Sequence, residues 1–311
     1  MKHSEGLLPD NDGATLGKPK RRTRRTKRAD LPGPLYLAHF GLHEAPFGIT
    51  PDTEFIYATR SHQEGVNTLL IALRSGEGFI KITGEVGTGK TLLCRRLLKS
   101  LAESDCLTVY LPNPGLSPET LLRSVATELG LPLQQESDPY LLLKSLSEAL
   151  LDYAWQGKTV VVLLDEAQAI PIEALETLRL LSNLETEKRK LLQIVMFGQP
   201  ELDAHLANPA IRQLRQRIAF SFHLGGMHRD ELRQYLTHRL RTAGLLAGEL
   251  FGNDAVNAIY VASRGTPRLI NILANKCLLQ VYGEGGQLVN AKHVRAAARD
   301  TEGAYSRWFW W

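Results

Sequence analysis

The sequence has few cysteines and no long hydrophobic run. Its 311 residues include three cysteines, Cys94, Cys106 and Cys277, an odd number without the paired spacing of a metal site. We interpret them as buried free thiols, which fits a reducing compartment and argues against a small disulfide-stapled scaffold. No apolar run approaches the ~18 residues that a transmembrane helix needs, and the N-terminus lacks the apolar core of a signal peptide. We therefore expect a cytoplasmic protein.

Positive charge is concentrated at the start of the chain. Residues 1–34 hold nine Lys or Arg against four acids, a net charge of +5, whereas the whole chain carries +4 and the remainder therefore −1. This segment is rich in Gly, Pro and Asp without hydrophobic periodicity, which predicts a disordered basic tail. Its cluster at 18–28 suits binding to nucleic acid or to an anionic membrane surface, although a solvated tail is the simpler interpretation.

Residues 84–91 read GEVGTGKT, which is Gly, four residues, Gly, Lys and Thr, the phosphate-loop pattern. The apolar run 78–83 predicts a strand before it, and leucines at helical spacing predict a helix after it. These flanks argue against a glycine-rich turn that matches by chance. Lys90 is expected to reach the β- and γ-phosphates of a bound triphosphate, and the Thr91 hydroxyl to ligate Mg²⁺. The nucleotide-binding residues expected from the pattern are Gly84, Glu85, Val86, Gly87, Thr88, Gly89, Lys90, Thr91 and Leu92.

A second signal follows about 70 residues later in the run TVVVLLDE, residues 159–166. Its apolar composition predicts a buried parallel strand, and such strands end at the nucleotide crevice. Asp165 is expected to hold Mg²⁺ and Glu166 to orient the attacking water as general base. Gln199 follows another buried strand, 191–198. Its amide suits contact with the γ-phosphate or the attacking water, or else only forms hydrogen bonds within the loop.

The remaining pattern divides the chain into an α/β part and an all-α part. Further strands are predicted at 106–112 and 218–224, and helices from about 61, at 117–130, 138–157 and 171–187, and through the run IRQLRQRI. From 228 only helices are predicted, at 228–245, 254–264, 266–282 and 290–300. We expect a tail at 1–34, a core at 35–226, a helical lid at 227–300 and an aromatic tail at 301–311. That last tail suits docking on a partner, contact with a membrane interface or packing on the lid.

Four arginines are candidate phosphate ligands. Arg268 opens a predicted lid helix near its positive end, a poor place for a cation unless an anion such as the bound phosphates lies nearby. Arg212, Arg215 and Arg217 precede the last strand and are either surface arginines or arginine fingers for a neighbouring subunit.

The motifs GEVGTGKT, VVVLLDEAQ, FGQPEL, RQLRQRI and GTPRLIN together resemble the AAA+ ATPases, and among them the ExeA/GspA group of secretion and pilus-assembly ATPases. The likeness covers about residues 35–300. It implies a three-layer αβα sandwich of the P-loop NTPase class with a parallel sheet in the order 5-1-4-3-2 and a small helical lid. It also implies sensor roles for Gln199 and Arg268, a trans-acting arginine at 212, 215 or 217, and nucleotide-dependent homo-oligomers, a hexamer being one form.

Three functions are compatible with these features. The first is an Mg²⁺-dependent ATPase that drives or regulates assembly of a type IV pilus or secretion apparatus, with apparatus proteins as partners at the inner-membrane surface. The second is an ATP-dependent DNA-binding adaptor resembling the AAA+ regulators of transposition, which the basic tail favours. The third, a scaffold without hydrolysis, is disfavoured because a pure switch does not need Glu166. ExeA/GspA proteins continue into a membrane span and a cell-wall-binding domain, whereas this sequence ends at Trp311, so peptidoglycan binding is not expected.

Overall fold

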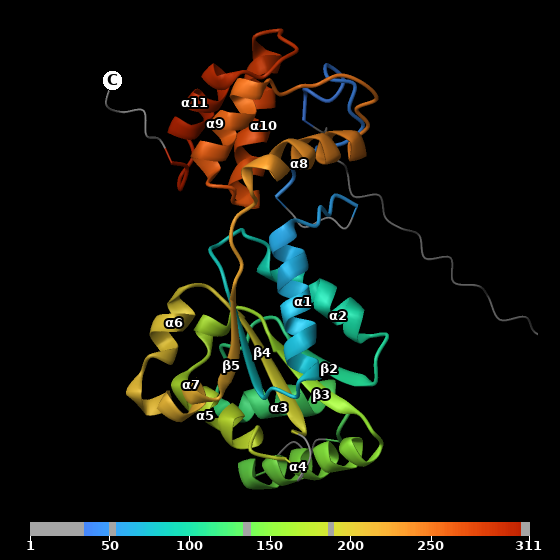
Figure 1. Cartoon of the computed structure of the whole chain (residues 1–311), viewed down its shortest axis with the longest axis vertical. Helices are drawn as coiled ribbons and strands as arrows, with labels where there is room; N and C mark the ends of the chain where they lie inside the picture. Colours follow the sequence, from blue (N-terminus) through green and yellow to red (C-terminus); the bar gives the residue numbers. More distant parts are fainter. Residues whose placement is uncertain (1–33, 50–53, 133–137, 186–189, 306–311) are drawn as a thin grey trace, which may run out of the picture. The chain divides into compact units, whose positions relative to one another are not determined.

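The computed structural model describes residues 34–49, 54–132, 138–185 and 190–305 (Figure 1). The predicted basic tail, apart from Pro34, and the terminal aromatic run 308–311 lie outside the described residues.

Five parallel strands form one sheet in the order β2-β3-β4-β1-β5. The strands are β1 (Phe79–Thr83), β2 (Cys106–Leu111), β3 (Thr159–Leu164), β4 (Leu192–Gly198) and β5 (Ile218–His223). This confirms the predicted order, counted from the other edge of the sheet. In the register, Thr83 lies beside Gly198 and His223, so that β1, β4 and β5 end at the same edge. The loops that follow β1, β3 and β4 therefore meet at that edge.

Helices cover both faces of the sheet (Figure 1). One face carries α1 (Arg60–Arg74) and α2 (Lys90–Leu101). The other carries α3 (Pro118–Glu128), α4 (Pro139–Trp155), α5 (Ile172–Leu181), α6 (Glu201–Leu206), the 3₁₀ turn η2 (Pro209–Ile211) and α7 (Arg212–Gln216). A further 3₁₀ turn, η1 (Ala167–Ala169), follows β3. The architecture is a three-layer αβα sandwich.

The continuous apolar run of β3 is explained by its burial on both faces. Val160, Val162 and Leu164 pack with the helices on the α3–α7 side, whereas Val161 and Leu163 pack with α1 and α2. All five side chains are fully buried. A strand that contacts helices on each side cannot alternate between apolar and polar residues.

The structure differs from the sequence prediction at two places. The helix predicted over 171–187 is α5, which ends at Leu181. Its C-cap is Ser182, whose hydroxyl donates to the Arg179 carbonyl in the last turn. A bridge between Glu185 and Lys190 then leads into β4. Helix α6 was not predicted, because six residues are too few to show a helical period.

The C-terminal part is helical, as predicted, with α8 (Arg229–Thr242), α9 (Asn253–Ser263), α10 (Pro267–Gly283) and α11 (Ala291–Arg299). These helices share a hydrophobic core with the leader, the name used here for the described residues 34–49 and 54–58. The leader contributes five buried side chains to that core, Tyr36, Phe40, Leu42, Phe47 and Phe55. The Tyr36 hydroxyl also donates to Asn275 Oδ1 at 2.6 Å. The domain limits predicted from the sequence stay predictions.

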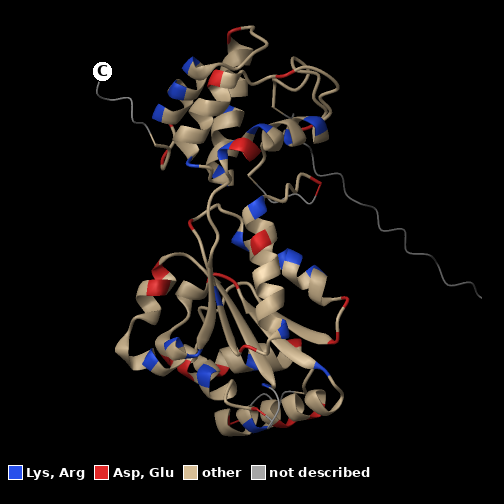
Figure 2. Ribbon diagram, viewed as in Figure 1, with Lys and Arg blue, Asp and Glu red and all other residues tan. Residues whose placement is uncertain are grey.

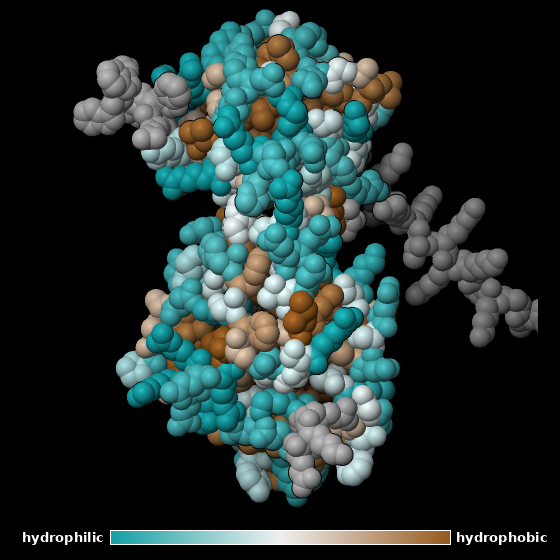
Figure 3. Space-filling view, in the orientation of Figure 1, coloured by the Kyte–Doolittle hydropathy of each residue, from teal (hydrophilic) through white to brown (hydrophobic). Residues whose placement is uncertain are grey.

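Charged residues lie mainly on helices and loops, and the strands in Figure 2 are almost free of them. On the face shown in Figure 3, hydrophobic residues form separate patches on a mostly hydrophilic surface. Within the described ranges, no helix combines the length and the hydropathy that a membrane span requires.

Candidate nucleotide-binding site

The loop after β1 needs glycine at two positions. Gly87 and Gly89 have φ values of +83° and +99°, in the left-handed region that side chains disfavour. Space is also limiting, since a Cβ atom at Gly87 would lie 2.4 Å from Arg268 Cβ, and one at Gly89 would lie 2.5 Å from His62 Nε2. The loop therefore keeps a bare backbone, whose N–H groups can approach an anion closely.

Lys90 is the first residue of α2 and is buried. Its ammonium group donates to the carbonyl oxygens of Gly84 at 2.7 Å and of Glu85 at 3.1 Å. Burial lowers the pKa of Lys90, and the nearby carboxylates of Glu166 and Asp165 oppose that shift. The ammonium thus lies inside the loop, where phosphate oxygens can replace the carbonyl acceptors.

Thr91 and Asp165, the two residues expected from the sequence to hold Mg²⁺, lie side by side. The Thr91 hydroxyl donates to Asp165 Oδ2 at 2.8 Å, and the Tyr110 hydroxyl on β2 points to the same oxygen at 3.4 Å. Burial and the Asp165 charge raise the pKa of Tyr110 to about 12, so that it stays a hydroxyl. A hydroxyl and a carboxylate are hard oxygen donors of the kind that Mg²⁺ prefers, so these residues fit that ion.

Glu166 lies just after β3 with a φ of +54°, one of two described non-glycine residues in the left-handed region. Its Oε2 accepts hydrogen bonds from Gln168 Nε2 at 2.6 Å and from Gln199 Nε2 at 3.1 Å. Burial raises the pKa of Glu166, but the two amides and Lys90 outweigh it, so that the pKa lies below its usual value. The carboxylate is ionised and held at one oxygen, as an orienting base requires.

A cavity of about 680 Å³ opens at this loop, which is large enough for a nucleotide. One side of the cavity is formed by residues 86–92 of the phosphate loop and α2 together with Glu166 and Gln199. Its apolar side includes leader residues, among them Ile49, Phe55, Ile56 and Tyr57. The leader thus supplies apolar surface to the cavity, which suits packing against the base of a nucleotide.

Arg268 also lines the cavity, from the first turn of α10. Its backbone N–H donates to the Gly87 carbonyl at 3.3 Å, and its side chain is exposed. The arginine therefore lies beside the phosphate loop, although it comes from the helical part.

The other three arginines lie elsewhere. Arg212 and Arg215 belong to α7, and Arg217 precedes β5. All three are exposed, and none lines the cavity. The phosphate loop follows β1, whereas the three arginines precede β5. Because β1 and β5 are parallel, the arginines lie near the opposite ends of the strands from the phosphate loop. They are absent from the site of their own chain.

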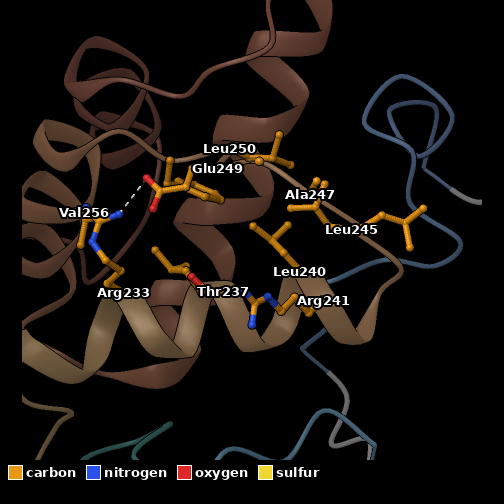
Figure 4. A pocket seen from close by; sticks show the side chains of 13 residues that line it. Arg233, Thr237, Leu240, Arg241, Leu245, Ala247, Glu249, Leu250 and Val256 are labelled. Carbon is orange, nitrogen blue, oxygen red and sulfur yellow. Dashed lines mark hydrogen bonds and ion pairs between the residues drawn. The ribbon is translucent and has the colours of Figure 1, made fainter.

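A second cavity lies between α8 and the loop that follows it (Figure 4). Its volume is about 60 Å³, and Arg233 at its edge pairs with Glu249 at 3.1 Å. It is far too small for a nucleotide.

Sequence analysis missed three residues of the main site, namely Gln168, Tyr110 and His62. Gln168 offered the clearest signal, since it is a polar residue two positions after the predicted base. Tyr110 is one polar group in a hydrophobic strand, and only the pairing of β2 with β3 brings it to Asp165. His62 is buried at the start of α1, which the sequence alone does not reveal.

Comparison with known proteins agrees with this geometry. The family described as AAA domain matches residues 73–206. A solved structure, Cdc6p from Pyrobaculum aerophilum, superposes with a TM-score of 0.61 at 18% identity, covering 83% of this chain and 73% of that one. The fold is that of the P-loop AAA+ ATPases. At this level of identity, the structural likeness concerns the AAA+ fold alone.

Two curated relatives extend the comparison. General secretion pathway protein A of Aeromonas hydrophila is 37% identical over 276 residues, which cover 89% of this chain and 50% of that protein. The Holliday junction branch migration complex subunit RuvB of Lactococcus lactis is 27% identical over 187 residues, covering 55% of this chain and 53% of its own length. The chain thus spans about half the length of the curated relatives that it matches.

Proposed function

We propose that this protein is an Mg²⁺-dependent ATPase. The observation that carries the proposal is that Lys90, Thr91 and Glu166 line one cavity at the carboxyl ends of the strands, with Asp165 hydrogen-bonded to Thr91. Lys90 and the loop amides bind the phosphates, Thr91 and Asp165 hold Mg²⁺, and Glu166 orients the attacking water. Bound Mg²⁺ supplies neutralisation of the charge that develops on the phosphates. Gln199 and Arg268 contact the γ-phosphate end as sensors.

Phosphate release by purified variants tests this proposal. Lys90→Ala should lose ATP binding, because the loop loses its only buried ammonium. Glu166→Gln should bind ATP but turn it over at least about a hundredfold more slowly, since the amide cannot accept the proton of water. A Glu166→Gln protein as active as the wild type would reject Glu166 as the base.

We also propose that hydrolysis requires a neighbouring copy of the chain. Arg212, Arg215 and Arg217 are exposed and lie away from their own cavity, which suits an arginine that completes the site of another subunit. Mixing two inactive proteins tests this: Glu166→Gln with an alanine variant of each arginine. Activity should return in the mixture that contains the variant of the arginine that acts in trans. In that mixture, a site on the arginine variant has an intact Glu166 and receives an intact arginine from the neighbouring Glu166→Gln subunit. Failure of all three mixtures, with each arginine variant inactive alone, would contradict action in trans.

The biological role that we propose is assembly or regulation of a secretion apparatus or type IV pilus from the cytoplasmic side of the inner membrane. The likeness to a general secretion pathway protein over 89% of this chain supports it. The stretches FGLHEAPFGITPDTEFIY and LRLLSNLETEKRKLLQIVMFGQPELD resemble the MSHA pilus-biogenesis ATPase MshM, which favours a pilus. Glu166→Gln protein, trapped with ATP, should co-purify with inner-membrane apparatus proteins, whereas Lys90→Ala protein should not.

A DNA-binding adaptor is the second candidate, favoured by the basic cluster at 18–28 and by the likeness to a branch migration subunit. In that case ATP would promote filaments on DNA that resist salt. Binding lost at physiological salt would instead indicate nonspecific attraction between the tail and phosphates.

A further inference from the structure

The base proposed at Glu166 is held by two amides, and these are not equivalent. Gln168 and Gln199 both donate to Oε2, at 2.6 and 3.1 Å. Two donors on one carboxylate oxygen fix the rotation of the group and leave the other oxygen, Oε1, as the acceptor for water. The orientation of the base thus depends on whichever amide stays in place during the reaction.

Gln168 is anchored independently of any nucleotide. Its Oε1 accepts the backbone N–H of Gln199 at 3.0 Å, and its carbonyl oxygen lies 3.2 Å from His205 Nδ1. A Cβ atom at Gly198 would lie 3.2 Å from Gln168 Oε1, so the amide fits closely against the end of β4. The Gln168 side chain therefore spans from the main chain of β4 to the carboxylate after β3.

Gln199 has no comparable anchor, since the one described hydrogen bond of its side chain is the bond to Glu166. When that amide turns to the γ-phosphate, as proposed above, its bond to Oε2 is lost. The Gln168 bond is then the one that remains. A single fixed donor is enough to orient a carboxylate that hydrogen-bonds to water.

We propose that Gln168 is the positioning residue for Glu166: it holds the carboxylate by Oε2 while hydrolysis proceeds. The inference rests on the proposed ATPase activity. Gln168 does not line the cavity, so its loss should act on turnover and leave nucleotide binding intact.

The test compares kcat and KM for ATP in Gln168→Met and Gln168→Glu proteins. Methionine has similar length but donates no hydrogen bond, so kcat should fall about tenfold with KM and ATP affinity unchanged. Glutamate keeps the acceptor for the Gln199 N–H but places a second negative charge at Glu166, so kcat should fall further than in the methionine variant.

Gln193→Met is the matched control. Gln193 is a buried glutamine of β4 whose amide donates to the carbonyls of Leu73 at 3.0 Å and Glu77 at 2.9 Å, away from the cavity. Its loss should lower the melting temperature and leave kcat unchanged at a temperature where the protein is folded. It shows what the loss of a structural amide alone does.

Each outcome decides the matter. Unchanged or raised kcat in Gln168→Met, with Glu166→Gln inactive, would overturn the positioning role while the ATPase stands. A near-normal Gln168→Glu protein would also overturn it, because the side chain would then act only as an acceptor. If Glu166→Gln itself is fully active, Glu166 is not the base. The proposed function then fails, and the positioning role of Gln168 fails with it.

Discussion

His62 Nε2 lies against the backbone of Gly89, so closely that a Cβ atom on that glycine would stand 2.5 Å from the nitrogen. The histidine comes from the first turn of α1, and its other ring nitrogen bonds the Thr59 hydroxyl at 2.6 Å. The last glycine of the phosphate loop is thus backed by a buried side chain from a separate helix.

Gly89→Ala should abolish the stabilisation of the protein by ATP, because the added methyl group must displace either the loop or His62. The matched control is Gly157→Ala, which has a similar φ of +81° and nothing within 4 Å of its would-be Cβ. The control carries the backbone strain alone, about 1–3 kcal/mol. Thermal melts with and without ATP should show a ligand shift for the control and none for Gly89→Ala. An equal ligand shift in both would mean that the contact with His62 is unimportant.

Burial lowers the pKa of His62 below its usual value. Below a pH of about 6.5 the unfolded chain binds a proton at this position that the folded protein does not bind. The free energy of unfolding should therefore decrease as the pH falls, by at most about 1.4 kcal/mol per pH unit from this group. Urea unfolding at several pH values measures the slope. His62→Gln should flatten it, and an unchanged slope would assign the pH dependence to other groups.

Asp165→Asn should remove the effect of Mg²⁺ on ATP binding, because a neutral amide is a weak ligand for that ion. Affinities for ATP measured with Mg²⁺ and with a chelator should converge in this variant and differ in the wild type. Tyr110→Phe is the control, since it removes only the 3.4 Å contact to the same carboxylate. It should change affinity by less than about threefold. A large Mg²⁺ effect in Asp165→Asn would move the metal site elsewhere.

Glu231 on α8 caps two helices at once. One oxygen accepts the N–H of Arg60, the first residue of α1, at 2.8 Å, and the other accepts the N–H of its own N-cap, His228, at 3.1 Å. Glu231→Gln should lower the free energy of unfolding by about 1–3 kcal/mol, because an amide accepts at only one end. The neighbouring Asp230→Asn breaks only the exposed ion pair with Arg60 and should cost under about 1 kcal/mol. Equal losses in chemical denaturation would refute the double cap.

Much of the fold and the site could be predicted from the sequence. The loop 84–91 and the acids 165 and 166 could be proposed from the sequence because their expected chemistry depends on residues adjacent in the chain. Strand β3 was recognised as a buried strand because a run of six β-branched and aliphatic residues suits few other environments. The strand order came from the resemblance to known ATPases and not from the pattern itself.

The unpredicted features depend on contacts between distant residues. Gln168 meets Glu166 through a local turn, but its anchor is the Gln199 N–H, 31 residues further on. From the sequence, Glu231 is only an acidic residue in the first turn of a helix. Its second partner, Arg60, lies 171 residues away. The leader shows irregular aromatic residues without a period, so nothing in the sequence says which helices cover them.

The packing of the leader has a consequence for synthesis. Its five buried side chains belong to the core formed with α8–α11, and the whole β-sheet lies between these segments in sequence. Chains tend to fold from the N-terminus as they leave the ribosome. Here the leader emerges before the sheet but has no core until the last helices are made. The sheet and its phosphate loop can therefore fold before the leader is packed.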